Sequence, residues 1–326
     1  MISKAEPAEY SRENVESKLK YLQNSMAIEP EELASSLVEF IKVYVKKLER
    51  EGVIIGLSGG IDSAVIAALC KRAVGAENTL ALILPEKDSR KEHQVDAQIF
   101  ANELGIATKL IDLTPYLEML EVYKLSPVNK PFLPEKIKGT LIGKAYDYYR
   151  RKTGETPFSA SLTGLRDKEF DSYLKKGNAY YRVKHRLRML LLYLYAELEN
   201  RLVVGSTNKS EYEIGFFVKY GCDVANDILP LLNLYKTQVR ELARYLNIPA
   251  KIREKAPSPD ILPGLTDEKA LSISYEKLDL ILIAFAKSWE VTEIAGALEI
   301  SEKQVIEIER LIQKSEHMRK IYAPSI

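Results

Sequence analysis

The sequence has little cysteine, histidine and tryptophan, and it has no excess of charge of either sign. Its 326 residues include two cysteines, three histidines and one tryptophan, with 47 basic and 46 acidic side chains. Cys70 and Cys222 provide neither a disulfide framework nor the spacing of a zinc site. A reducing cytoplasm is therefore the expected compartment. The balanced charge gives no global electrostatic reason to bind nucleic acid or an anionic membrane.

Long apolar runs are also missing. No segment approaches the roughly 20 apolar residues that cross a bilayer. The charged stretch at residues 1–23 lacks the apolar centre of a signal peptide. We therefore expect no membrane contact, while a hydrophobic content of 46% is enough for a sizeable core.

The most informative feature that is present is a glycine-rich turn between an apolar strand and an apolar helix. Residues 53–57 predict the strand, and residues 58–63 read Ser-Gly-Gly-Ile-Asp-Ser before a helix that begins at Ala64. Gly59 and Gly60 let the backbone approach an anion closely, so that N–H groups and the positive end of the helix converge on phosphate. The turn predicts a pyrophosphate-binding site.

Hydroxyl and carboxylate groups complete this turn. Ser58 and Ser63 add donors to phosphate. Asp62 would repel a phosphate directly but is suited to hold Mg²⁺ against it. The alternative is a strand–turn–helix corner whose glycines and serines only shape the chain. The combination favours the nucleotide site, and it resembles the ATP-pyrophosphatase (PP-loop) family rather than a Walker loop or a dinucleotide fingerprint.

Strands and helices alternate through the first third of the chain. Apolar strands are predicted at residues 52–57, 79–84 and 107–111, separated by helices at 64–73 and 92–104. This alternation is typical of an α/β fold, a parallel sheet with helices on both faces, in which ligands bind at the carboxyl ends of the strands.

The rest of the chain is predicted as one further strand, an insertion and a series of helices. Helices are expected at 31–50, 183–199, 236–246, 276–286, 292–298 and 302–314, and a strand at 201–204. Residues 120–182 have weak periodicity and many Lys and Tyr, so we interpret them as an insertion or lid over the sheet edge. The expected organisation is a single domain over 1–326, with 276–326 as a carboxyl-terminal helical segment.

A second polar cluster, Gly205 to Glu211, follows the strand at 201–204. If that strand is parallel to the first, its carboxyl end faces the same crevice, and Glu211 becomes a second oxygen ligand for the ion held by Asp62. The alternative is that Glu211 only complements the dipole of a surface helix. Lys219 and Lys236 lie further along and are candidates for the fixed cations that neutralise departing pyrophosphate.

The order of these motifs closely resembles the ammonia-dependent NAD synthetases. The resemblance runs through most of the chain and is carried by LSGGIDSAV at 57–65, ILPEKDS at 83–89, KHRLRM at 184–189, VVGSTNKSE at 203–211, GFFVKYG at 215–221, DILPLLNLYKTQVRELARYL at 227–246, KAPSPDILPGLTDE at 255–268, ISYEKLD at 273–279 and KSEHMR at 314–319.

The resemblance implies a homodimer with an adenine nucleotide alpha-hydrolase-like fold. Such an enzyme adenylylates the carboxylate of deamido-NAD with ATP, and ammonia then displaces AMP. Matching motifs assign ATP contacts to Ser58, Gly59, Gly60, Asp62, Ser63, Ser206, Lys236 and Ser258, and Mg²⁺ to Asp62 and Glu211. They assign catalysis to Asp62, Lys219 and Lys236, and deamido-NAD contacts to Arg186, Lys219, Asp227 and His317.

Such a reaction needs no side-chain nucleophile, because adenylylation supplies the leaving group and positioning supplies much of the rest. This agrees with the lack of a Ser-His-Asp or Cys-His pattern around the histidines, of which His93 and His185 are interpreted as ordinary helix residues. Neither cysteine lies in a recognisable nucleophile setting, so no attached glutaminase is expected. Free ammonia or a separate glutaminase then supplies the nitrogen.

The departures from the family pattern fall mainly on the acceptor side. Cys222 stands where the family has Asp, and the adjacent Asp223 is a candidate to replace that carboxylate. Arg182 replaces an Asn and Met318 replaces a Lys, whereas on the ATP side Ser206 replaces a Thr. The insertion is also longer than the family pattern predicts.

Two other functions compete with this interpretation. One is an amidating or adenylylating enzyme of the same scaffold that acts on a different carboxylate or on tRNA. The other is a DNA-binding regulator, because residues 292–311 have the spacing of a helix-turn-helix. Glu302, Glu307 and Glu309 on its second helix are poor partners for phosphates, so this alternative is less favoured.

Overall fold

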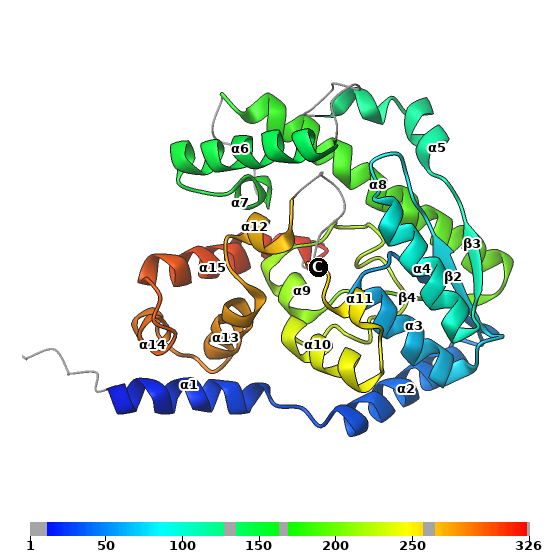
Figure 1. Ribbon diagram of the computed structural model, residues 1–326, viewed down its shortest axis with the longest axis horizontal. Helices are drawn as coiled ribbons and strands as arrows, with labels where there is room; N and C mark the ends of the chain where they lie inside the picture. Colours follow the sequence, from blue (N-terminus) through cyan, green and yellow to red (C-terminus); the bar gives the residue numbers. More distant parts are fainter. Residues whose placement is uncertain (1–11, 127–134, 163–168, 257–264, 325–326) are drawn as a thin grey trace, which may run out of the picture.

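The computed structural model describes residues 12–126, 135–162, 169–256 and 265–324. Its centre is a sheet of four parallel strands in the order β3-β2-β1-β4 (Figure 1). The strands are β1 (Gly52–Gly56), β2 (Thr79–Ile83), β3 (Ala107–Leu110) and β4 (Arg201–Val204). The predicted parallel α/β fold is therefore confirmed.

Helices cover both faces of this sheet, which explains the continuous apolar runs of the inner strands. Alternate residues of β1 point to opposite faces: Val53 and Ile55 belong to one core and Ile54 to another. The first core includes residues of α2 (Pro30–Lys47), α3 (Ile61–Val74), α4 (Lys91–Leu104), α10 (Lys236–Tyr245) and α11 (Ala250–Arg253). The second lies under α5 (Thr114–Met119), η1 (Val122–Leu125) and α8 (Asp171–Leu198).

The insertion is helical in its described parts. It contributes α6 (Glu135–Thr153), α7 (Pro157–Leu162) and the first half of α8. Helix α8 begins twelve residues earlier than the predicted start at Val183, because its early turns carry the Lys- and Tyr-rich sequence that obscures helical periodicity. In Figure 1, α6 and α7 lie beside α12 and the upper part of α8.

The remaining helices form a separate core beside the sheet. They are α1 (Arg12–Met26), α9 (Lys209–Ile214), α12 (Asp267–Leu271), α13 (Tyr275–Ala286), α14 (Val291–Ala297), α15 (Glu302–Ser315) and η2 (Glu316–Met318). Leu22 of α1 is fully buried in this core, where α1 packs against α13 and α14 (Figure 1). Within the described residues, no helix is both long and apolar enough to cross a bilayer.

Candidate functional site

The glycine-rich turn lies at the carboxyl end of β1, as the sequence predicts. Gly59 has φ +79°, and a Cβ there would strike the main-chain carbonyl of His93 in the first turn of α4. Both the positive φ and the lack of space for a Cβ therefore require glycine at this position. The Ser58 and Ser63 hydroxyls lie 3.1 Å apart, and Ser63 Oγ donates to the Gly60 carbonyl at 3.0 Å. The turn is thus held in shape before any ligand binds.

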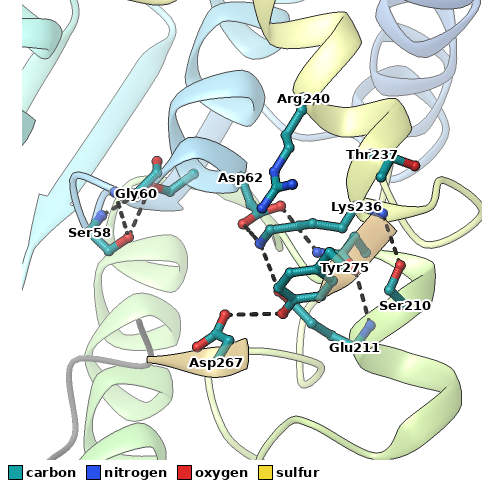
Figure 2. Close-up of polar contacts among 12 residues, drawn as sticks. Ser58, Gly60, Asp62, Ser210, Glu211, Lys236, Thr237, Arg240, Asp267 and Tyr275 are labelled. Carbon is teal, nitrogen blue, oxygen red and sulfur yellow. Dashed lines mark hydrogen bonds and ion pairs between the residues drawn. The ribbon is translucent and has the colours of Figure 1, made fainter. Parts of the chain in front are cut away.

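Two carboxylates and a lysine meet beside this turn (Figure 2). Lys236 Nζ lies 2.5 Å from Asp62 Oδ2 and 3.0 Å from Glu211 Oε1. Asp62 is in the first turn of α3, Glu211 in the first turn of α9 and Lys236 at the start of α10. Asn208 also donates to Asp62 Oδ1 at 3.1 Å. The structure therefore brings together residues that are 174 positions apart in the sequence.

The cluster is electrostatically perturbed because it is largely removed from water. Burial raises the pKa of Glu211 to about 7; the Asp62 charge acts in the same direction and Lys236 opposes it. Burial by itself disfavours the Lys236 ammonium, yet the nearby Asp62 and Glu211 carboxylates raise its pKa above the ordinary value. Lys236 is consequently a fixed positive charge at neutral pH.

Two further residues surround Lys236 that the sequence analysis did not single out. Tyr275 is buried with its ring centroid 5.1 Å from Lys236 Nζ, and its hydroxyl donates to Asp267 Oδ2 at 3.0 Å (Figure 2). Burial raises the pKa of Asp267 to about 6. Both residues fall inside segments that carry the family resemblance, but nothing in their local pattern marks them as site residues.

A buried hydrogen-bond network holds the three helices of the cluster in place. Ser210 Oγ accepts from the backbone N–H of Lys236 at 2.9 Å and donates to Asp279 Oδ1 at 2.5 Å. The other oxygen of Asp279 accepts from the backbone N–H of Thr237 at 2.8 Å. A single carboxylate of α13 therefore fixes both α9 and the start of α10.

The donor set of this cluster is suited to Mg²⁺. Asp62 and Glu211 offer carboxylate oxygens, which are the ligands that Mg²⁺ prefers. Both carboxylates already converge on one cationic atom, Lys236 Nζ, which stands in the position of a shared positive charge. The residues present thus fit the divalent ion that the sequence analysis assigns to them.

A cavity of about 1010 Å³ opens from the turn and the cluster. That volume lies at the upper end of the range for small-molecule sites and is large enough for a nucleotide with a second substrate. Ser206 from the end of β4 lines it, as do Tyr146, Tyr149 and Tyr181 from the insertion. The insertion thus contributes directly to the wall of the site.

Lys255 is a further cation at this cavity. Its Nζ donates to the Gly59 carbonyl at 3.1 Å and lies 2.5 Å from Asp96 Oδ2 on α4. Asp96 is buried, and Lys251 and Lys255 hold its pKa below the ordinary value against the opposing effect of burial. Lys255 opens one of the motifs of the sequence analysis, yet only the fold shows that it reaches the phosphate turn. Ser258, the nearby predicted ATP contact, lies outside the described residues.

Three of the four residues predicted to contact deamido-NAD form a neighbouring group, and none of the four lines the described cavity. Exposed Arg186 donates to the Lys219 carbonyl at 3.3 Å, and Lys219 Nζ donates to the carbonyls of His317 and Lys320, each at 2.7 Å. Lys219 is therefore not brought to the Asp62–Glu211 pair. Met318, where the family pattern has a lysine, is buried in the helical core, so its apolar side chain serves packing.

Asp227 lies apart from that group, beside β4. Its two oxygens accept from Tyr193 Oη at 3.1 Å and from the Val203 backbone N–H at 2.8 Å. This contact fixes the turn after residue 226 against the sheet. The role of Asp227 in binding a substrate stays a prediction.

A second buried charge cluster was not anticipated from the sequence. Lys184 of α8 lies 2.9 Å from both Glu86 Oε1 and Asp88 Oδ2, which belong to the loop after β2. Tyr180 and Tyr123 donate to Asp88 and Glu86, respectively. Glu86 and Lys184 belong to two of the motifs that carry the family resemblance, and the fold joins these residues across 98 positions.

His185 lies in helix α8, as predicted, and it also contacts the loop after α9. Its Nδ1 lies 3.0 Å from Asp223 Oδ2 and 3.6 Å from Cys222 Sγ. The contact joins α8 to the loop after α9 across 37 positions, so no spacing in the sequence could indicate it.

Comparison with known proteins agrees with this site. Residues 33–153 and 155–322 match the family model described as NAD synthase. The chain is 42% identical over 289 residues to the NH(3)-dependent NAD(+) synthetase of Thermotoga maritima, which covers 88% of this chain and 97% of the relative. It is 35% identical over 292 residues to the protein of the same name from Pyrococcus furiosus, covering 89% and 93%.

Two solved structures are similar to the chain over most of its length. The NMN synthetase of Francisella tularensis superposes with a TM-score of 0.66 at 31% identity, covering 92% of this chain and 99% of that one. The NH3-dependent NAD synthetase of Campylobacter jejuni superposes with a TM-score of 0.63 at 27% identity over the same shares.

Proposed function

The chain belongs to the NAD synthase family, and from this premise we propose that it amidates deamido-NAD to NAD with ammonia. The enzyme is a C–N ligase, and ATP is its co-substrate. The observation that carries the proposal is the meeting of Asp62, Glu211 and Lys236 beside the phosphate turn at one cavity. The alternatives of a DNA-binding regulator and of a tRNA-modifying enzyme are not favoured by the relatives.

The chemistry has two steps. A carboxylate oxygen of the acceptor attacks the α-phosphorus of ATP and breaks its bond to the bridging oxygen, which releases pyrophosphate. Ammonia then attacks the carbonyl carbon of the acyl-adenylate, expels AMP and loses a proton. Negative charge accumulates on the departing phosphates in the first step, so preorganised positive groups accelerate it.

The chain supplies these positive groups from three directions. The backbone of the turn and the amino-terminal end of α3 face the cavity. Lys255 is fixed to the turn through the Gly59 carbonyl. Lys236 also lines the cavity, where it is paired with Asp62. Asp62 and Glu211 would hold Mg²⁺, which when bound neutralises phosphate charge. Lys236, beside these two carboxylates, would have its ammonium available to the leaving group.

The acceptor side of the proposal rests on the sequence motifs. Arg186, Lys219, Asp227 and His317 are proposed to contact deamido-NAD, and the mutual contacts of Arg186, Lys219 and His317 support a common role for those three. Ser206 and Ser258 are proposed to contact ATP.

Several further features are proposals from the family resemblance. They are a homodimer, a cytoplasmic location, nitrogen from free ammonia or from a separate glutaminase, and one domain over 1–326 with 120–182 as a lid and 276–326 as a helical segment. The insertion residues that line the cavity support the lid.

The decisive experiment measures AMP and pyrophosphate release with ATP, Mg²⁺ and ammonium while the acceptor is varied. The panel contains deamido-NAD, the carboxylate precursor of NMN, and unrelated carboxylates. We expect deamido-NAD to give the highest kcat/KM. A higher value for the NMN precursor would keep the adenylylation chemistry but reassign the acceptor, whereas no AMP with deamido-NAD would refute the proposal.

Asp62→Ala tests the residues proposed to bind Mg²⁺ and the phosphates of ATP. We expect turnover to be lost with every acceptor, because the variant removes a proposed ion ligand and the partner of Lys236. Glu103→Gln, which removes an exposed carboxylate of α4, is the control and should retain full activity. An active Asp62→Ala enzyme would refute the assigned role of Asp62.

A further inference from the structure

Three side chains of metal-ligand type meet on the cavity wall, apart from the proposed Mg²⁺ ligands. His185, Cys222 and Asp223 each offer one atom to a group whose members lie within 4.8 Å of one another. His185 Nδ1 is 3.0 Å from Asp223 Oδ2 and 3.6 Å from Cys222 Sγ, and Sγ is 3.8 Å from Asp223 Oδ1. All three residues line the cavity.

Backbone contacts fix this arrangement in advance. The Cys222 N–H donates to the His185 carbonyl at 3.1 Å, which attaches the loop to α8 beside the imidazole. Asp223 Oδ2 accepts from the Val218 N–H at 2.9 Å, and the Asp223 carbonyl accepts from the Thr207 hydroxyl. The three donor atoms therefore meet because the loop is folded around them, and no side chain has to leave its place to converge.

The group is not arranged as a nucleophile triad. In such a triad the acid and the nucleophile contact opposite ring nitrogens of the histidine. Here Asp223 and Cys222 both face Nδ1, and Nε2 has no hydrogen-bond partner among the described residues. Burial together with the Asp223 charge also raises the pKa of the Cys222 thiol, so an unliganded Cys222 is protonated and a poor nucleophile.

The spacing does suit one tetrahedral ion. With Zn–N and Zn–O bonds of about 2.0–2.1 Å and Zn–S of about 2.3 Å, ligand atoms of a tetrahedral site lie about 3.3–3.6 Å apart. The three observed separations among His185 Nδ1, Cys222 Sγ and Asp223 Oδ1, which are 3.1, 3.6 and 3.8 Å, bracket this range. One nitrogen, one sulfur and one oxygen form a donor set that favours Zn²⁺ over Mg²⁺.

We propose that His185 Nδ1, Cys222 Sγ and a carboxylate oxygen of Asp223 bind one Zn²⁺-class ion. Binding displaces the thiol proton of Cys222 to solvent and leaves the imidazole neutral, with its proton on Nε2. The ion joins α8 to the 218–223 loop, and its fourth position faces the cavity, where water or a substrate oxygen completes the tetrahedron. The site does not depend on which carboxylate the enzyme amidates.

The test uses Co²⁺ as a spectroscopic substitute for Zn²⁺ in the chelator-treated full-length protein. We expect one equivalent to produce a sulfur-to-cobalt charge-transfer band and the intense visible bands of a tetrahedral site. One equivalent of Zn²⁺ should abolish both, whereas a large excess of Mg²⁺ should leave them. Cys222→Ser should remove the charge-transfer band, and His185→Asn should weaken Co²⁺ affinity by more than about 10-fold.

Two controls separate this site from the others. Cys70→Ala removes the fully buried second cysteine and should leave the cobalt spectrum unchanged. Asp62→Ala should abolish turnover and also leave the spectrum unchanged, so that failure of the proposed reaction and failure of this site give different results. The proposal is refuted if wild-type protein shows no stoichiometric charge-transfer band, or if the band persists in Cys222→Ser.

Discussion

Lys236 is buried, and its ammonium contacts two carboxylates instead of water. Its side chain is 2% exposed, and an unpaired ammonium at such a position would carry a large desolvation penalty. Asp62 and Glu211 compensate for that penalty, and in return Lys236 keeps two neighbouring negative charges from repelling each other. A residue of the chain itself therefore supplies part of the counter-charge of the metal-free site.

Replacing that lysine separates its two roles. We expect Lys236→Met to destabilise the metal-free protein by about 3–5 kcal/mol, because it leaves two carboxylates close together without a counter-charge. Mg²⁺ should restore much of this stability but not turnover, since the fixed cation facing the leaving group is still missing. Thermal unfolding with and without Mg²⁺, together with AMP release, measures both effects.

Lys277→Met on the exposed side of α13 is the control for this substitution, and should change stability by no more than about 0.5 kcal/mol. An equal loss of stability with and without Mg²⁺ would mean that Asp62 and Glu211 do not share an ion.

The raised pKa of Glu211 predicts how the affinity for Mg²⁺ varies with pH. Its folded-state pKa is about 7, against an ordinary value of 4.5, so between these values the folded protein keeps a proton that the unfolded chain has released. This contribution to the stability of the metal-free protein therefore falls as the pH rises from 4.5 to 7. Mg²⁺ competes with the same proton, and its apparent affinity should rise over this window by up to about 10-fold per pH unit.

Calorimetric titration with Mg²⁺ between roughly pH 5.5 and 8 tests this expectation. In Glu211→Gln the remaining affinity should be weak and nearly independent of pH across the window. A wild-type affinity that does not vary with pH would contradict the shifted pKa.

Helices α9, α10 and α13 act as one unit through Asp279. Its two oxygens accept from the Ser210 hydroxyl and from the Thr237 N–H, and Ser210 in turn accepts from the Lys236 N–H. Burial raises the pKa of Asp279 to about 6 in spite of these bonds. The position of Lys236 thus depends on a carboxylate that does not line the cavity.

Asp279→Ala should therefore lower kcat without direct contact to substrate. It leaves a buried hydroxyl and a buried N–H without an acceptor, at a cost of about 1–3 kcal/mol for each group. Asp279→Asn retains one acceptor oxygen and should recover most of the stability and of kcat. The measurements are chemical unfolding and initial rates at saturating ATP; unchanged kcat in Asp279→Ala would exclude this positioning role.

The strands and their ligand-bearing ends were predictable from the sequence, whereas the supporting residues were not. Predicted and observed strands agree to within one residue at their ends, because buried parallel strands leave continuous apolar runs. Asp62 and Glu211 were found because each follows a strand of the same sheet. Tyr275, Asp279 and Lys255 were missed because their role arises from tertiary contacts that leave no local pattern.

At the scale of the molecule, an apolar stripe on α8 remains uncovered. Leu190, Leu194 and Leu198 follow one another at four-residue intervals and are 59%, 49% and 69% exposed. An exposed stripe of this kind often marks a protein interface. It is the surface that we expect the proposed homodimer to bury.

Leu194→Lys should then shift the protein from dimer to monomer, because the interface would have to bury an unpaired ammonium. Analytical ultracentrifugation of the wild type and variant measures the change. Ile321→Lys, at a residue 82% exposed near the carboxyl end, is the control and should leave the oligomeric state unchanged. A dimeric Leu194→Lys protein would place the interface elsewhere.

Helix α8 also has a mechanical consequence. Its 28 residues form a rod about 42 Å long at about 1.5 Å per residue. Near its start Tyr173 lines the cavity, and near its other end Leu192 and Ala196 pack under the sheet. Between them, Lys184 is paired with Glu86 and Asp88. Contacts with η1, β1 and β4 also hold this rod, so it joins the insertion to the sheet as one stiff element. A load that a bound substrate places on the insertion would therefore be carried along α8 to β1 and β4.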